Sequence, residues 1–325
     1  MSLTDASAER IRARRDYLRA NRHRLVIDGD VHPTRWEDLP ADHQRRIDSS
    51  DRYFHGRALL TTDLVPLMDR AGVDMAVCWQ NPAALPYTED RAENARRLEH
   101  ANAAIAELAH QHPQRVIPAG WTDPKALGVE AAVALARKCV LEFGMPIVKL
   151  NPAQNSYPID CPMVMTVVDA IVALGAVPAF HFGSDTVFTP PAGLGRVAAR
   201  HPDHPVIGVH MGGGGGNFVD AEPIYQGAVQ LGLDQPNIFF VLSALREVYA
   251  ETAIATYARA GHPSSANLAL GSDAPYCSMV WVFGGARAFM AHHTFDRAED
   301  RTDIMGGNLA DLVARADTTI LARAT

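Results

Sequence analysis

The chain has 325 residues, of which 47% are hydrophobic and 21% are charged, so it holds enough apolar material for a sizeable core and is not intrinsically disordered. Its net charge of −7 argues against a broad electrostatic surface for nucleic acid or anionic membrane, and a small molecule is the expected partner. Four scattered cysteines, the lack of an 18-residue apolar run and the lack of a secretory signal lead us to expect a cytoplasmic protein without a membrane span.

Residues 1–23 mix arginines with acidic residues and predict a solvated helical extension. Beyond it, short apolar runs alternate with stretches of helical composition, and the polar segment 33–62 predicts an irregular cover over a site. There are eight such runs: Arg24–His32, Val73–Gln80, Arg115–Trp121, Pro146–Asn151, Val177–Gly183, Pro205–Gly212, Asn237–Ser243 and Asn267–Asp273.

Unbroken apolar runs that are separated by helices are typical of parallel strands buried on both faces. Eight repeats without a strand-only region favour an α/β fold closed into a (β/α)₈ TIM barrel, and a doubly wound open sheet is the alternative. No linker or change of composition divides the repeats. We therefore predict a single barrel domain over residues 24–325, preceded by the helical extension.

Polar residues end several of the predicted strands, and in a TIM barrel the site lies at the carboxyl ends of the strands. Asp30 and His32 are two residues apart, so both project from the same face of the first strand. His181 ends the fifth run and Asp273 ends the eighth. Any one of these residues alone is more often an ordinary buried group, but two imidazoles and two carboxylates together predict a site for one divalent ion, with zinc, manganese and iron as candidates.

Two further residues end inward-facing strands. His210 closes the sixth run and is assigned a general acid/base role, because an imidazole transfers protons near neutral pH; a fifth metal ligand is the alternative. Lys149 closes the fourth run, and we interpret it as a structural and electrostatic group that neutralises inward carboxylates. A carbamate bridge to a second metal and a Schiff base are its alternatives.

Five consecutive glycines, Gly212–Gly216, follow His210 and Met211. A phosphate-binding loop would need a different glycine spacing and a lysine, and a linker would not sit between a strand and a helix of the repeat. We expect these glycines to let the backbone turn sharply beside the site without side-chain bulk.

The order and spacing of several short motifs resemble the amidohydrolase superfamily, in the branch of aminocarboxymuconate-semialdehyde decarboxylase and related decarboxylases, hydratases and hydrolases. The resemblance covers about Val26–Leu312. It rests on "IDGDVH", "MDRAGVDMAVCW", "VKLNP", "GAVPAFHFG", "VIGVHMGG", "LGSDAPY" and "IMGGNLADL".

The resemblance implies metal ligands at Asp30, His32, His181 and Asp273, with His210 and Asp273 as the catalytic pair. Much of the superfamily has H-x-H where this chain has D-x-H at Asp30. A carboxylate at that position adds a hard oxygen ligand to the site, which favours manganese over zinc.

A divalent ion in such a site supports either non-oxidative decarboxylation of a carboxylated aromatic or unsaturated substrate, which we favour, or hydrolysis and hydration by an activated water. Arg246 is assigned to a substrate carboxylate, and a solvent-facing helix start is its alternative. The predicted substrate contacts are Trp36, His55, Trp79, Asn81, Trp121, Arg246 and Tyr276.

Two other classes of function stay open. One is a non-catalytic metal-binding or ligand-binding barrel, against which the complete set of candidate ligands counts. The other is a nucleotide-dependent α/β enzyme, which only the glycine run suggests. By analogy with barrels of the same branch, the N-terminal helix predicts a homodimer.

Overall fold

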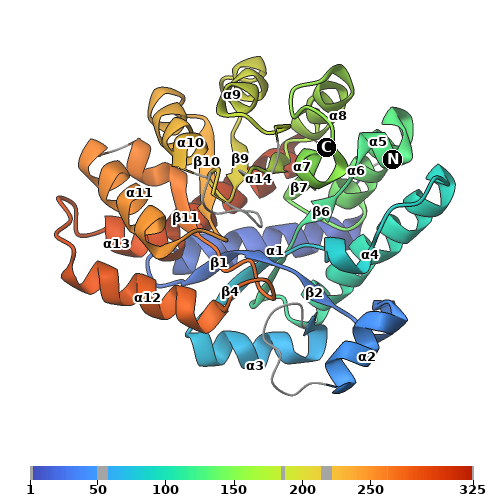
Figure 1. Cartoon of the computed structure of the whole chain (residues 1–325), viewed down its shortest axis with the longest axis horizontal. Helices are drawn as coiled ribbons and strands as arrows, with labels where there is room; N and C mark the ends of the chain where they lie inside the picture. Colours follow the sequence, from blue (N-terminus) through green and yellow to red (C-terminus); the bar gives the residue numbers. More distant parts are fainter. Residues whose placement is uncertain (1–2, 50–57, 184–186, 214–221, 262, 324–325) are drawn as a thin grey trace.

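Residues 3–49, 58–183, 187–213, 222–261 and 263–323 are described in the computed structural model of the chain. Parallel strands lie at the centre of the molecule (Figure 1). One hydrogen-bonded group contains β1 (Ile27–Val31), β4 (Met75–Cys78) and β5 (Val116–Pro118). The other contains β6 (Gly120–Trp121), β7 (Ile147–Leu150), β8 (Val177–His181), β9 (Val206–Val209), β10 (Ile238–Leu242) and β11 (Leu268–Leu270).

Two junctions close these groups into a barrel. Only Ala119 separates β5 from β6, and its N–H donates to the carbonyl of Cys78 at 3.0 Å, so β5 and β6 act as one strand. At the other junction, Val31 pairs with Ala274, just beyond β11. The N–H of Asp273 donates to the carbonyl of Asp30 at 2.8 Å beside this pair. The predicted (β/α)₈ barrel is therefore confirmed, and the doubly wound alternative is excluded.

Helices surround the barrel, and most strands lead into one (Figure 1). None of the helices in the described ranges has the length and apolar composition needed to cross a lipid bilayer. The surrounding helices are α3 (Thr61–Ala71), α4 (Arg91–Gln111), α5 (Pro124–Leu127), α6 (Val129–Leu141), α7 (Pro152–Asn155), α8 (Pro162–Ala173), α9 (Pro191–Arg200), α10 (Glu222–Asp234), α11 (Glu247–Ala260), α12 (Met279–His292) and α13 (Asp300–Thr302). Three short helical turns, η2 (Pro82–Ala84), η4 (Ser264–Asn267) and η5 (Asp303–Gly307), complete the connections.

The polar segment 33–62 is more regular than the sequence predicted. Its described part contains β2 (Pro33–Thr34), η1 (Trp36–Asp38), α2 (Ala41–Ser49) and β3 (Leu59–Leu60), and β2 pairs with β3 in parallel. These elements are too short to produce a hydrophobic period that a sequence window detects. The expectation of an irregular segment is corrected accordingly.

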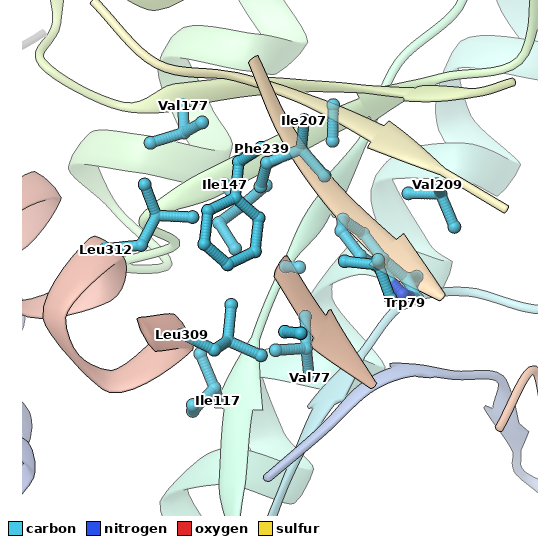
Figure 2. Packing of buried hydrophobic residues seen from close by; sticks show 14 of the residues in the cluster. Val77, Trp79, Ile117, Ile147, Val177, Ile207, Val209, Phe239, Leu309 and Leu312 are labelled. Carbon is cyan, nitrogen blue, oxygen red and sulfur yellow. The ribbon is translucent and has the colours of Figure 1, made fainter. Parts of the chain in front are cut away.

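Apolar side chains fill the barrel below its polar end. Figure 2 shows inward residues from many strands packed together, among them Ile147, Val177 and Phe239. Leu309 and Leu312 of α14 (Asn308–Arg323) approach the same cluster, so the last helix covers the amino-terminal end of the barrel. The polar groups at the opposite end therefore stand on a dry, close-packed base, where electrostatic interactions are weakly screened.

The N-terminal helix α1 (Asp5–Asn21) begins at the cap Thr4, whose hydroxyl accepts from the N–H of Ser7. It packs along α14, with Ile11 and Leu18 fully buried. A buried ion pair joins the two helices: Arg14 Nε lies 3.0 Å from one Asp317 oxygen, and Nη2 lies 2.5 Å from the other. The buried face of α1 thus contacts its own chain, and a homodimer through the exposed face stays a prediction.

Replacing Arg14 with methionine is expected to lower the free energy of unfolding by roughly 3–5 kcal/mol, because a fully buried Asp317 carboxylate is then left without its counter-ion. The double variant Arg14→Met, Asp317→Leu should recover most of this loss, since no charge is buried. Urea denaturation followed by circular dichroism measures both. Arg19→Met is the matched control, because Arg19 makes only an exposed contact with Thr318. Equal losses in the single and double variants would contradict the account.

Candidate metal centre

Three predicted ligands converge at the carboxyl ends of neighbouring strands. Asp30, His32 and Asp273 each offer one ligand atom within 4.8 Å of the others. His32 Nε2 lies 3.3 Å from Asp30 Oδ1 and 3.4 Å from Asp273 Oδ1. All three residues are buried. This donor set of two carboxylate oxygens and one imidazole nitrogen fits a divalent ion, because its residues combine anionic oxygen with a neutral nitrogen ligand at coordinating spacing.

The backbone at this point is shaped by Asp28. The register of β1 against β4 shifts between Asp28 and Val31. Asp28 Oδ1 accepts hydrogen bonds from the N–H of Asp30 at 3.1 Å and from the N–H of Ser272 at 2.8 Å, which ties the end of β1 to the end of β11. At Gly271 an added Cβ would lie 3.0 Å from the Cβ of Asp30, so only glycine permits this approach.

Asp273, two residues after Gly271, has φ of +57°, in the left-handed region that non-glycine residues seldom occupy. His210 has φ of +77° at the end of β9. Strained backbone of this kind persists where the surrounding structure holds it, and such positions cluster at functional sites. Two of the predicted site residues thus stand in conformations that the barrel imposes on them.

The Asp30 carboxylate contacts the charged groups that set the electrostatics of the site, the Lys149 ammonium and the His32 ring. Burial alone would raise the pKa of its carboxyl, but the ammonium of Lys149 and the hydrogen bond with His32 outweigh it and hold the pKa well below its usual range. Lys149 Nζ lies 3.2 Å from Asp30 Oδ1. For Asp273 the balance is the reverse: burial and the charge of Asp30 raise its pKa.

His32 is held from both sides. Its Nδ1 lies 2.8 Å from the carbonyl of Gln80, so this nitrogen carries the proton and donates it. Its Nε2 faces the two carboxylates. Burial lowers the pKa of the ring, but the hydrogen bonds to Asp273 and Asp30 prevail and raise it to about 9. In a loaded centre, the Gln80 carbonyl would orient the ring and direct Nε2 toward the ion, as partners of metal-bound histidines do.

Lys149 is enclosed by two predicted substrate contacts. Its Nζ lies 4.8 Å from the ring centroid of Trp79 and 5.1 Å from that of Trp121, which are cation–π distances. Both indoles are only 1% exposed, so in this structure they face Lys149. The geometry fits the electrostatic interpretation of Lys149, while substrate contacts by the two tryptophans stay predictions.

His210 belongs to a chain of hydrogen bonds that starts at Asp30. Ser243 Oγ lies 2.7 Å from Asp30 Oδ2 and 2.9 Å from His210 Nδ1. His210 Nε2 lies 3.2 Å from His181 Nδ1. His181, the fourth predicted ligand, is therefore next to His210, and it is not part of the group whose ligand atoms lie within 4.8 Å among the described residues.

The direction of this chain follows from the ionised state of Asp30. A carboxylate only accepts, so Ser243 donates its proton to Asp30, and His210 Nδ1 must then donate to Ser243 Oγ. Burial keeps the pKa of His210 well below its usual value, and the neutral ring accepts at Nε2 from His181 Nδ1–H. This assignment places the lone pair of His181 on Nε2, the atom through which it would bind a metal.

Replacing Ser243 with alanine is expected to lower kcat by roughly 10- to 100-fold, because Asp30 loses a donor and His210 Nδ1 loses its nearer acceptor, keeping only the Ser243 carbonyl at 3.3 Å. Steady-state kinetics on a substrate of the enzyme measure this effect. The thiol of Ser243→Cys is a weaker donor than the hydroxyl, so the kcat of this variant should lie between those of the wild type and Ser243→Ala. Wild-type kcat in Ser243→Ala would show that the hydroxyl does not position His210.

The other predicted contacts are spread more widely. Tyr276 and Asn81 are joined, since the Tyr276 hydroxyl donates to Asn81 Oδ1 at 2.7 Å, and the tyrosine ring lies 5.9 Å from the ring of His32. Trp36 is 38% exposed on η1. Arg246 is exposed at the start of α11, as its alternative interpretation has it. His55 lies outside the described residues.

The glycine run is described only at its first two positions, and Gly214–Gly216 lie outside the described residues. Gly212 has φ of +78°. At Gly213 an added Cβ would overlap the side chain of Leu245. At these two positions the loop therefore has the sharp turn and the lack of room for side chains that the sequence predicted.

Sequence reasoning missed two residues of the centre. Asp28 lies two residues before Asp30, and the pattern D-x-D-x-H was visible but its first carboxylate gave no sign of a backbone role. Ser243 ended a predicted strand and was not assigned a function. A rule that treats each short polar residue at the carboxyl end of a barrel strand as a candidate site residue would have included Ser243.

A family model described as amidohydrolase matches residues 27–314 of the chain. The chain belongs to the amidohydrolase family. The resemblance stated from the motifs is thereby confirmed, and with it the expectation of an enzyme from the group of metal-dependent carboxy-lyases and hydrolases.

This amidohydrolase is similar to several characterised proteins. The 2-amino-3-carboxymuconate-6-semialdehyde decarboxylase of Dictyostelium discoideum is 24% identical over 114 residues, a match that spans 35% of this chain and only 31% of that protein. The 5-carboxyvanillate decarboxylase of Novosphingobium aromaticivorans, solved with manganese and 4-hydroxy-3-methoxy-5-nitrobenzoic acid, has a TM-score of 0.67 at 16% identity, covering 89% of this chain and 96% of that one. The 2,6-dihydroxybenzoate decarboxylase from Rhizobium has a TM-score of 0.64 at 16% identity, covering 89% and 98%. At 16% identity, the structural similarity to these two enzymes shows a shared fold and nothing further about function.

Proposed function

We propose that this amidohydrolase is a divalent-metal-dependent decarboxylase, which removes CO₂ without oxidation from a small carboxylated aromatic or unsaturated substrate. The observation that carries the proposal is the convergence of Asp30, His32 and Asp273 within 4.8 Å at the mouth of an apolar barrel. The decarboxylase activity of several proteins with the same fold supports this reaction over the others.

The ligand set favours a hard ion. Two of its three grouped donors are carboxylates, which suit manganese, and zinc is the alternative. We assign the fourth ligand to His181 through Nε2, because the hydrogen bond from its Nδ1 to His210 fixes that tautomer. A related decarboxylase from Polaromonas was crystallised with manganese, which agrees with this choice.

An ion held by Asp30, His32, His181 and Asp273 would supply the positive charge that stabilises a substrate carboxylate in this centre. Lys149 keeps Asp30 ionised as a ligand. Tyr276 offers an aromatic surface near the centre that suits a planar substrate. Trp79 and Trp121 face Lys149 and would contact a substrate only after a change of side-chain position. Arg246, Trp36 and His55 stay candidates for the outer rim.

In the proposed reaction the bond between the carboxyl carbon and the ring or enol carbon breaks. Its electron pair stays on the ring or enol carbon, CO₂ leaves, and that carbon takes up one proton. We assign delivery of this proton to His210 at Nε2, because Nδ1 is committed to Ser243. The ring is neutral at rest and carries no proton on Nε2, so Nε2 first takes up a proton from solvent and then passes it to that carbon. Asp273 would share in proton handling as well as in ligation.

A metal-dependent hydrolase or hydratase is the alternative, because the same histidine could assist the attack of water. One experiment separates these functions and the non-catalytic barrel. Purified protein is analysed for bound metals, and a panel of hydroxybenzoates, carboxylated vanillates, lactones, esters and amides is tested with and without chelator. We expect manganese or zinc near one per chain, CO₂ release from an aromatic acid, and loss of that activity in chelator. Turnover of lactones or esters alone would assign the hydrolase, and full activity in chelator would overturn both.

A further inference from the structure

The strand-to-strand hydrogen bonding of the barrel wall has a gap beside β6. The strand formed by β5 and β6 is bonded to β4 as far as Ala119, whose N–H donates to the carbonyl of Cys78. Beyond that point β4 has ended, and the N–H of Trp79 donates to the carbonyl of Val31 instead. At Trp121 the described strands therefore offer no backbone partner on this side, and a buried peptide group that stays unpaired is costly.

The side chain of Asn102 fills this gap. Asn102 is a fully buried residue of α4. Its Nδ2 donates to the carbonyl of Trp121 at 2.9 Å, and its Oδ1 accepts from the N–H of Trp121 at 2.9 Å. The carboxamide thus makes both of the bonds that a residue of an adjacent strand would make.

The other edge of β6 is held by β7. Trp121 pairs in register with Lys149, and the N–H of Thr122 donates to the carbonyl of Lys149 at 3.0 Å. Successive peptide groups of a strand point to opposite sides, so the N–H and carbonyl of Trp121 are directed toward Asn102. The backbone of Trp121 is therefore fixed by β7 on one side and by a single side chain on the other.

The indole of Trp121 contacts two charged or polar groups of the site. Its ring centroid lies 5.1 Å from Lys149 Nζ and 6.1 Å from the ring centroid of His32. Lys149 Nζ lies in turn 3.2 Å from Asp30 Oδ1. Trp121 is only 1% exposed, so a loosened backbone would move the indole against these groups and admit water beside the ammonium.

We propose that Asn102 is a positioning residue of the metal centre, which acts through Trp121 on Lys149 and His32. The inference deepens the proposed function and rests on the metal centre assumed there. It adds a residue of a surrounding helix, which a search of the strand ends does not select.

Tryptophan fluorescence of the full-length protein, freed of metal by chelator, tests the positioning. Asn102→Ala leaves the peptide groups of Trp121 to water, so we expect the emission to shift to longer wavelength. Most of this shift should disappear in a Trp121→Phe background, which removes the reporting indole and keeps its backbone. An equal shift in both backgrounds would overturn the proposal.

Isothermal titration calorimetry with Mn²⁺ measures the effect on the centre. We expect Asn102→Ala to bind Mn²⁺ about tenfold more weakly than the wild type, at the lower end of the effect of outer partners on metal affinity. Unchanged affinity in a folded Asn102→Ala variant would refute the proposal. If the wild type bound no Mn²⁺, the proposed function would fail instead, and the emission experiment, which needs no metal, would still decide the role of Asn102.

Asn94→Ala is the matched control. Asn94 lies on the same helix, is 1% exposed, and its Nδ2 also donates to backbone carbonyls, those of Thr88 and Ala126. The control therefore loses comparable buried hydrogen bonds but not a contact with Trp121, so its emission and its Mn²⁺ affinity should stay at wild-type values. Equal changes in Asn94→Ala and Asn102→Ala would show an effect of general stability and contradict the positioning role.

Asn102→Asp is a second variant of nearly the same shape, and circular dichroism verifies that each variant is folded. At alkaline pH its ionised carboxyl accepts from the N–H of Trp121 but donates nothing to the carbonyl, so one of the two bonds is lost. Its emission and its Mn²⁺ affinity should lie between those of the wild type and Asn102→Ala. Wild-type values of both in this variant would count against the proposal.

Discussion

Asp30→Asn is expected to abolish metal binding at the proposed centre and to reduce the proposed decarboxylation by roughly three orders of magnitude or more, well beyond the 10- to 100-fold that loss of an outer partner costs. The carboxylate contacts Lys149, His32 and Ser243 at once. An amide of the same shape carries no charge, so it cannot balance the Lys149 ammonium or supply an anionic ligand. Metal content by mass spectrometry and CO₂ release measure the two effects.

Asp234→Asn is the control for this substitution, because Asp234 is exposed at the end of α10, where the chain leads into the amino-terminal end of β10 rather than the carboxyl end that holds the centre. It should keep both metal and activity. If Asp30→Asn bound metal with wild-type stoichiometry, Asp30 would not be a necessary ligand. The role of the residue would then reduce to holding Lys149 and Ser243 in place.

His210→Gln is expected to lower kcat by about 10²- to 10⁴-fold while metal content stays near that of the wild type. Glutamine keeps hydrogen-bonding capacity toward Ser243 and His181 but has no group that exchanges a proton near neutral pH. Because the chemical step slows while binding contacts persist, we expect the loss in kcat with little change in KM.

The comparison with Ser243→Ala sharpens this prediction. His210→Gln removes the group that carries the proton, so it should lower kcat more than Ser243→Ala, which removes only the group that orients His210. His204→Gln is a suitable control, since His204 is remote from the centre and its Nε2 contacts the carbonyl of Ala176. A His210→Gln variant that lost its metal would instead identify His210 as a fifth ligand, which is the alternative that the sequence left open.

The barrel could be predicted because each strand is a run of apolar residues with few polar interruptions, such as the stretch that became Ile238–Leu242. The helices were predicted for a similar reason, although Gly128, with φ of +87°, divides one expected helix into α5 and α6. The segment 33–62 was missed because β2 and β3 depend on pairing with each other across a long stretch of chain. Such pairing has no local signal.

The part of the candidate site that lies at strand ends could be predicted, because the sequence shows where the strands end. Asp30, His32 and Asp273 end strands that the barrel brings together, and their positions follow from the fold. The hydrogen bonds of His210 could not be predicted, although Ser243 and His181 both end strands, because the two residues approach it through side-chain rotamers and through backbone with positive φ at His210 itself. Burial of Trp79 and Trp121 against Lys149 depends likewise on packing across three strands.

The ammonium between the two indoles also affects how long a product stays bound. Before loading, the carboxylates of Asp30 and Asp273 are balanced by the Lys149 ammonium and by the His32 ring, whose pKa is raised to about 9. A divalent ion would replace the proton on His32 and leave the centre with one excess positive charge. A substrate with a single carboxylate neutralises that charge inside a barrel with little water to screen it. In the proposed reaction, a product that is uncharged after CO₂ has gone would lose this attraction. We therefore expect the centre to retain acids and discharge their decarboxylated products.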